Sequence, residues 1–107
     1  MSRTSANRLR TFKQDVEQAF PGQLDRVLLF GSRARGEATS GSDYDVAVVF
    51  FSATSIAGAR PILSDIAFRF VRVGTPIRPI AICANDVSLS SVIPVARNIA
   101  RDGVVIQ

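Results

Sequence analysis

Two aspartates separated by one residue, Asp43 and Asp45, stand at the start of a strongly apolar stretch. Side chains at positions i and i+2 of a strand project from the same face, so this spacing predicts two carboxylates side by side at the rim of a sheet. Taken singly, a turn cap at Asp43 and an exposed strand residue at Asp45 are the plainer explanations. Taken together, two like charges near an apolar core need a cation. Oxygen ligands without nearby nitrogen or sulfur suit Mg²⁺, or the similar Mn²⁺, completed by water and substrate phosphates.

A second chemical pattern precedes the aspartates, in the segment GSRARG at residues 31–36. Gly31 allows the backbone to approach a ligand closely, and Ser32 with the following amides could hydrogen-bond the terminal phosphates of a nucleotide. Arg33 and Arg35 would neutralise those phosphates. The plainer explanation for Gly31 is that it only turns the chain, but its position just before a carboxylate pair favours a nucleotide and metal site.

The composition excludes several other kinds of active site. The chain has no histidine and a single cysteine, Cys83, which rules out a Ser-His-Asp triad, a Cys-His nucleophile pair and a zinc site of Cys and His ligands. Carboxylates and hydroxyls must therefore carry any chemistry. One cysteine cannot form a disulfide within the chain, which fits a cytoplasmic location. The longest apolar run, Val46 to Phe51, is far shorter than the ~20 residues that span a bilayer, so no membrane role is expected.

Length and charge bound the remaining possibilities. With 107 residues, 47% hydrophobic and 21% charged, residues 1–107 are expected to form one folded domain. The net charge is +4, and every cation except Lys13 is an arginine, which favours phosphate-bearing partners, although these charges could simply solvate the surface. Direct nucleic-acid binding through the arginines is a weaker alternative, because few aromatic residues are free to stack on bases.

Hydrophobic spacing and turn residues predict a fold in which these residues join two strands. We expect an α/β (α+β) class with a small mixed β-sheet of three or four strands and helices packed on it. Pro79 cannot donate to a β-ladder, which predicts an edge strand or a bulge there. The expected order is helix Ser5–Phe20, strand Val27–Phe30, loop 32–42 with at most one helical turn, strand Asp43–Phe51 covered on both faces, helix from Pro61 to Phe70, strand Ile77–Cys83, helix between Pro94 and Gly103, and a terminal stub at Val104–Ile106.

At these residues the sequence resembles the minimal nucleotidyltransferases of the DNA polymerase β superfamily. Their signature reads Gly-Ser-x-Ala-Arg-Gly, a short loop, then Ser-Asp-x-Asp and an apolar strand, which residues 31–36 and 42–49 match. The resemblance implies a polymerase β-like fold in which Gly31 and Ser32 hold a nucleoside triphosphate, most simply ATP. Asp43 and Asp45 would bind Mg²⁺ and align the α-phosphate for attack by an acceptor hydroxyl of a protein, RNA or small molecule.

One position departs from the family pattern. The family has a third carboxylate on a later strand, and alignment with Ile77-Arg78-Pro79-Ile80 puts Arg78 in its place. A different register, or a carboxylate from Asp86 or Glu37, would restore the acid. Alternatively, Arg78 pairs with Asp45 and replaces a metal, or it is an edge-strand arginine with its head in water.

Two hypotheses of function follow from the resemblance. The first is a Mg²⁺-dependent nucleotidyltransferase that moves a nucleoside monophosphate to a hydroxyl. The second is a catalytically inactive, antitoxin-like subunit, which the arginine at position 78 favours. Family members of this size often act beside a separate HEPN-type helical partner in toxin-antitoxin pairs, so both a partner protein and self-association are open.

Overall fold

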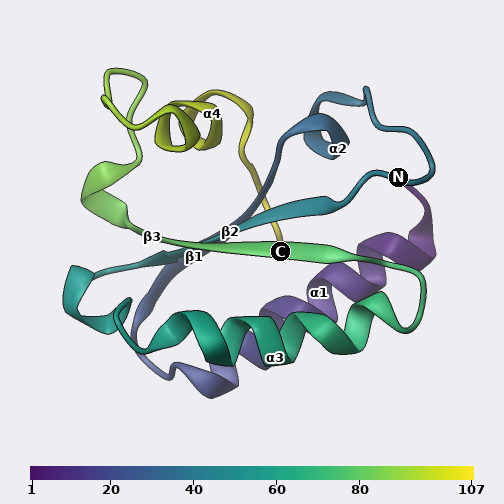
Figure 1. Cartoon of the computed structure of the whole chain (residues 1–107), viewed down its shortest axis with the longest axis horizontal. Helices are drawn as coiled ribbons and strands as arrows, with labels where there is room; N and C mark the ends of the chain where they lie inside the picture. The colour runs from purple at the N-terminus through teal and green to yellow at the C-terminus, as the bar shows by residue number, and fades with distance from the viewer.

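The computed structural model describes residues 1–107, and its centre is a four-stranded mixed sheet with strand order β3-β2-β1-β4. Helices α1 and α3 cover one face, and α2 and α4 lie on the other (Figure 1). The α+β arrangement predicted from the sequence, a small mixed sheet with helices packed on it, is confirmed. The elements are α1 (Arg3–Ala19), β1 (Leu24–Phe30), α2 (Ser32–Arg35), β2 (Tyr44–Phe50), α3 (Ala59–Val71), β3 (Ile77–Cys83), α4 (Pro94–Asp102) and β4 (Val104–Val105), with short 3₁₀ turns at Ala53–Ser55 and Ala84–Asp86.

Helix α1 begins two residues before the predicted start. The Ser2 side chain accepts a hydrogen bond from the Ser5 amide at 3.1 Å and so caps the helix, which adds a turn that hydrophobic spacing alone does not indicate. Farther along, Phe12 is completely buried and meets Phe70 of α3 edge-to-face, with ring centroids 5.7 Å apart. This contact holds α1 and α3 together beneath the sheet.

The sheet register brings the starts of β2 and β3 together. These strands run parallel, with Asp45 opposite Arg78, while β1 and β2 run antiparallel, with Phe30 opposite Asp45. β3 has the predicted bounds and lies at the edge, as Pro79 indicated. The prediction that the second strand includes Asp43 and Phe51 is wrong by one residue at each end, because the ladder runs from Tyr44 to Phe50.

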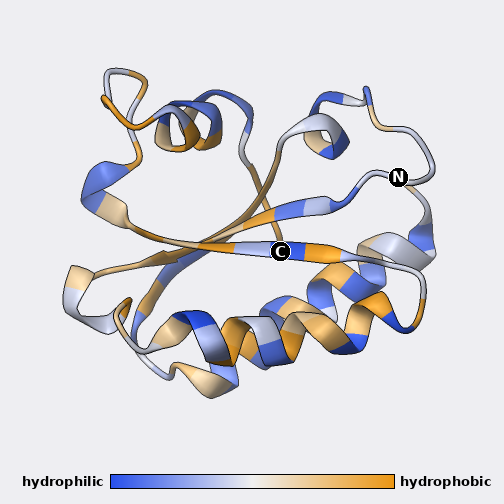
Figure 2. Ribbon diagram, in the orientation of Figure 1, coloured by the Kyte–Doolittle hydropathy of each residue, from blue (hydrophilic) through white to orange (hydrophobic).

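Alternation along the strands separates two apolar cores, one on each face of the sheet. Val46 and Val48 face α1 and α3, whereas Ala47 and Val49 face α4. Covered on both sides, β2 is buried along nearly its whole length. Figure 2 shows apolar residues through the middle of the sheet and hydrophilic residues near the starts of β2 and β3. The site residues therefore lie at the polar end of a well-packed sheet.

The remaining differences from the predicted elements are small. β1 begins at Leu24 rather than Val27. Its first residues pair with β2, but the side chains of Asp25 and Arg26 are exposed, so apolar spacing does not indicate them. α3 begins at Ala59, two residues before Pro61, which the first turn of a helix tolerates. The terminal stub pairs only over Val104–Val105. None of the helices combines the length and apolar character needed to cross a bilayer.

Candidate functional site

The carboxylate of Asp45 lies between the turn that opens α2 and the edge strand β3. Gly31 has φ +74° and ψ −157°, a backbone conformation that residues other than glycine rarely adopt. A Cβ atom built on Gly31 would lie 2.5 Å from Oδ2 of Asp45. Glycine is therefore required for two reasons, its backbone angles and the close approach of a carboxylate. This contact joins the two parts of the predicted site.

The other face of the same carboxylate is held by Arg78. Nε of Arg78 donates a hydrogen bond to Oδ1 of Asp45 at 2.8 Å, and Nη2 lies 2.8 Å from the same oxygen in the ion pair. The Asp45 side chain is 15% exposed, whereas that of Arg78 is 65% exposed. This hydrogen bond, followed by the charges of Asp45 and then Asp43, raises the pKa of Arg78 above its ordinary value. The alignment that placed Arg78 beside the aspartates is confirmed, and so is the predicted ion pair.

Asp43 lies at the same end of the sheet but outside the strand. It is exposed, forms no ion pair, and lines a surface hollow together with Pro76, Ile77 and Arg78. Its charge also contributes to the raised pKa of Arg78. The structure thus brings Asp43, Asp45 and Arg78 together, with one carboxylate free and one paired.

Neither of the other acids considered from the sequence joins this group. Glu37 binds Nε of Arg35. Asp86 follows the end of β3, and since β2 and β3 are parallel, it lies at the opposite end of the sheet from Asp45. No group of three or more His, Cys, Asp or Glu side chains is positioned to hold a metal ion. Only Asp43 and Asp45 could therefore serve as carboxylate ligands at this site.

Ser32 and Arg33 begin the short helix α2, whose first amides have no carbonyl partner within the helix. Arg33 turns back over the loop that follows. Its Nη2 donates to the Ser42 carbonyl at 2.9 Å, and its guanidinium carbon lies 4.2 Å from the centroid of the Tyr44 ring. Arg33 thus holds the loop that leads into Asp43, while phosphate binding by Ser32 and Arg33 stays a prediction.

Arg35 connects α2 to the C-terminal helix α4, through a residue that sequence reasoning missed. Its Nη1 donates to Oδ2 of Asp102 at 2.9 Å, and Nε of Arg101 donates to Oδ1 at 3.0 Å. Hydrogen bonds from Arg101 and then Arg35 lower the pKa of Asp102 to about 2. The chain pattern gives no sign of this pairing, because Arg35 and Asp102 are 67 positions apart in the sequence.

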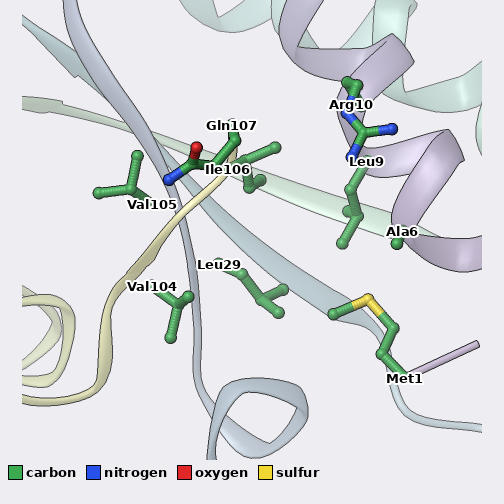
Figure 3. Close-up of a pocket in the computed structure, with 9 residues that line it drawn as sticks. All are labelled: Met1, Ala6, Leu9, Arg10, Leu29, Val104, Val105, Ile106 and Gln107. Atoms are coloured by element: carbon green, nitrogen blue, oxygen red, sulfur yellow. The ribbon is translucent and has the colours of Figure 1, made fainter. Parts of the chain in front are cut away.

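A separate apolar pocket lies between α1 and β4, away from the carboxylates (Figure 3). Leu9, Leu29 and Ile106 form much of its wall, and Arg10 is the only charged side chain that lines it. Because it contains no carboxylate, it supplies no metal ligand. The chemistry of the chain therefore centres on the polar ends of β2 and β3.

Comparison with known proteins identifies the family of the chain. The family model described as a nucleotidyltransferase domain matches residues 9–78, more than half of the chain. Two proteins of Methanocaldococcus jannaschii, each named "Putative protein adenylyltransferase", are similar in sequence. One is 38% identical over 93 residues, covering 82% of this chain and 61% of that protein; the other is 44% identical over 41 residues, covering 38% and 41%. The chain thus spans less than two thirds of the length of these relatives.

Two solved structures share the fold. A crystal structure of "a putative nucleotidyltransferase from Sulfolobus solfataricus" superposes with a TM-score of 0.55 and 22% identity, covering 95% of this chain and 82% of that one. A structure described as a toxin-antitoxin with AMP-PNP gives a TM-score of 0.59 and 14% identity, covering 92% and 72%. Fold, signature residues and family match agree, and this chain belongs to the nucleotidyltransferase domain family, of the minimal, polymerase β-like kind.

Proposed function

We propose that this chain binds a nucleoside triphosphate beside Gly31 and Ser32 and transfers its nucleoside monophosphate to a hydroxyl group. The observation that carries the proposal is the contact between the Gly31 turn and the Asp45 carboxylate, because the turn that we propose to bind phosphate and the side chain that we propose to bind the metal ion are then adjacent. Membership of the nucleotidyltransferase domain family supports the same activity.

The donor set fits a divalent ion that arrives with the triphosphate, not a resident metal. Two carboxylates without nitrogen or sulfur ligands suit Mg²⁺ or Mn²⁺, which complete their coordination with water and phosphate oxygens. Asp43 and Asp45 would hold such an ion. When bound, it neutralises phosphate charge and orients the α-phosphate for in-line attack.

The residues around the carboxylates prepare the site for this reaction. Arg33 fixes the loop before Asp43 through the Ser42 carbonyl, and Arg35 fixes the far end of α2 through Asp102. Asp43, exposed and without an ion-pair partner, is the group that could accept the proton of the attacking hydroxyl. A bond then forms from the hydroxyl oxygen to the α-phosphorus, and pyrophosphate leaves.

ATP is the proposed donor and a protein hydroxyl the first acceptor to test. The similar proteins of M. jannaschii carry the name of protein adenylyltransferases, and the toxin-antitoxin structure of similar fold was determined with AMP-PNP, an ATP analogue. RNA and small-molecule hydroxyls are the alternative acceptors. Reaction in the cytoplasm, where ATP and Mg²⁺ are available, is part of the same proposal.

The test is transfer of radiolabelled AMP from α-labelled ATP to proteins, RNA and small hydroxyl compounds, with Mg²⁺ and with EDTA. We expect Mg²⁺-dependent labelling by the wild type and at least a hundredfold loss in Asp43→Asn and Asp45→Asn. Asp86→Asn is the matched control, since that acid lies at the other end of the sheet. Equal labelling by all four proteins would reject the proposed site.

A second function is favoured by the ion pair between Arg78 and Asp45. With one of two carboxylates already neutralised, the chain would bind nucleotide and act as an antitoxin-like subunit that holds a HEPN-type helical partner. Phe68 and Val71 of α3 are exposed, 62% and 49%, and line the hollow beside the open edge of β3, which offers apolar surface for a partner.

Affinity purification distinguishes the two functions. A stable complex with a helical partner, together with nucleotide binding and no transfer by the complex, would favour the subunit. Transfer by the isolated chain with no stable partner would reject it. Size-exclusion chromatography with light scattering of the isolated chain tests self-association at the same time.

A further inference from the structure

We propose that Arg78 is a phosphate-binding arginine that forms an ion pair with Asp45 in the free protein. Because of this pair, a divalent ion binds to the site only together with a nucleotide. This inference rests on the proposed function and assigns a role to a residue outside the signature motif. In the free chain Arg78 occupies the carboxylate that the ion needs, and in the complex its guanidinium moves to the phosphates.

The geometry of the pair leaves Arg78 ready to move. Arg78 contacts one oxygen, Oδ1 of Asp45, to which Nε donates a hydrogen bond and from which Nη2 lies 2.8 Å. The guanidinium does not span the two carboxylate oxygens in the paired arrangement that makes Arg–carboxylate contacts strong. Its side chain is 65% exposed. β3 is an edge strand, so no neighbouring strand encloses the guanidinium. Water or phosphate oxygens can therefore replace Oδ1.

The local charges explain why the free site should reject a bare metal ion. Asp43 and Asp45 carry two negative charges, and Arg78 cancels one of them. Removing the guanidinium charge would leave both carboxylates for a cation. Since charge is the main attraction of an oxygen-ligand site for a divalent ion, Arg78 weakens metal binding in the absence of nucleotide.

The same charges explain why a nucleotide needs Arg78. The two arginines of the signature motif are already engaged, Arg33 with the loop carbonyl and Arg35 with Glu37 and Asp102. Arg78, in contrast, is paired with Asp45, the carboxylate that a metal ion would bind. Once the metal of a metal–nucleotide complex binds Asp45, the displaced guanidinium is free beside the phosphates, and its planar donors match phosphate oxygens.

Substitution of Arg78 should therefore change two affinities in opposite directions. For Arg78→Gln we expect binding of Mn²⁺ alone to tighten by about tenfold or more, because an opposing charge is lost. Binding of AMP-PNP with Mg²⁺ should weaken by about tenfold, because a charge-assisted phosphate contact is lost. A pair that only stabilises the fold would produce neither change.

Calorimetric titrations of Mn²⁺ alone and of AMP-PNP with Mg²⁺ test the proposal on the wild type, Arg78→Gln, Arg78→Lys and Arg72→Gln. Arg72 is an exposed arginine at the end of α3 and serves as the control. Lysine keeps the charge without the planar fork, so Arg78→Lys should keep weak Mn²⁺ binding and lose part of the nucleotide affinity. Circular dichroism establishes that each variant is folded.

The outcomes separate this inference from the proposed function. Tighter Mn²⁺ binding with weaker nucleotide binding, seen at Arg78 and not at Arg72, supports it. If the Mn²⁺ and nucleotide affinities of Arg78→Gln are both unchanged, or both higher, the inference about Arg78 is overturned. The proposed function still stands in that case if the wild type binds nucleotide. If neither the wild type nor any variant binds nucleotide, both this inference and the proposed function are overturned.

Discussion

At its beginning α2 rests on Asp45, whose other carboxylate oxygen is held by Arg78, and at its end α2 is held by Asp102 of α4. Both anchors are aspartates paired with arginine, but their surroundings differ. Asp102 receives hydrogen bonds from two arginines and its side chain is only 7% exposed. Asp45 has a single cation, on an exposed side chain, and a free aspartate nearby.

This difference indicates which anchor is structural and which belongs to the site. Two cations on a nearly enclosed carboxylate leave no place for an exchangeable ligand, so the Asp102 cluster fixes α2 against α4. At Asp45 one oxygen faces a glycine turn and the other an exposed guanidinium, which a ligand could displace. We therefore propose that the same kind of ion pair serves structure at Asp102 and ligand binding at Asp45.

Gly31→Ala should give the largest effect, because it breaks the Asp45 end of α2 directly. The new Cβ would meet Oδ2 of Asp45 at 2.5 Å, and the backbone conformation alone costs about 1–3 kcal/mol for a residue other than glycine. We expect urea unfolding to show a loss of at least this size and nucleotide titration to show loss of binding. Gly41→Ala is the control, since a Cβ there meets nothing within 4 Å; equal behaviour of the two variants would contradict the close approach.

Asp102→Asn should break the other end of α2 with a smaller loss of stability than Gly31→Ala. The amide can still accept a hydrogen bond, but Arg35 and Arg101 would face each other without the charge that joins them. We expect a lower midpoint of thermal unfolding by calorimetry and a several-fold weaker nucleotide affinity, because α2 is less well positioned. A thermal midpoint equal to that of the wild type would show that the contacts of Asp102 with Arg35 and Arg101 do not stabilise the fold.

Acid should remove the Asp102 contribution in a defined pH range. The pKa of this carboxyl is lowered from 3.8 to about 2, first by Arg101 and then by Arg35. A lowered pKa means that the unfolded chain binds the proton more readily, so the stabilisation is complete above pH 4 and is lost as pH falls through about 2. The difference in urea unfolding free energy between wild type and Asp102→Asn should therefore shrink from pH 5 to pH 2. A constant difference over that range would contradict the ionic origin.

The element order and the site segment could be predicted from the sequence because their determinants are local. Apolar spacing and turn residues define each element, and β3 was placed at the edge because Pro79 lacks an amide hydrogen. The loop from the Gly31 turn to Asp45 is also local, so the signature is visible in the chain. The predicted ends of elements differ from the observed ones where a capping side chain or strand pairing determines the end, as Ser2 does at the start of α1.

Long-range pairings could not be predicted in the same way. The Arg35–Asp102 contact joins residues 67 positions apart in the sequence and depends on how α4 packs after β3. Arg33 looked like a phosphate ligand because its type and position fit one, but a carbonyl and an aromatic ring compete for its guanidinium. The Arg78–Asp45 pair could be predicted, as one of several alternatives, because alignment with the family pattern puts Arg78 in the place of the third carboxylate, and the structure sets it opposite Asp45.

Arg78→Gln should have the smallest effect on stability, which sharpens the contrast with Asp102. An exposed ion pair contributes less than about 1 kcal/mol, and glutamine can still donate to Oδ1 of Asp45. We expect the urea unfolding free energy to change by less than this amount, and the change to diminish further in high salt, where exposed charges are screened. A loss as large as that of Asp102→Asn, persisting in salt, would make Arg78 a structural anchor. A small loss together with altered ligand binding would instead show that the chain keeps this arginine for what it binds, since so exposed a pair does little to hold β2 and β3 together.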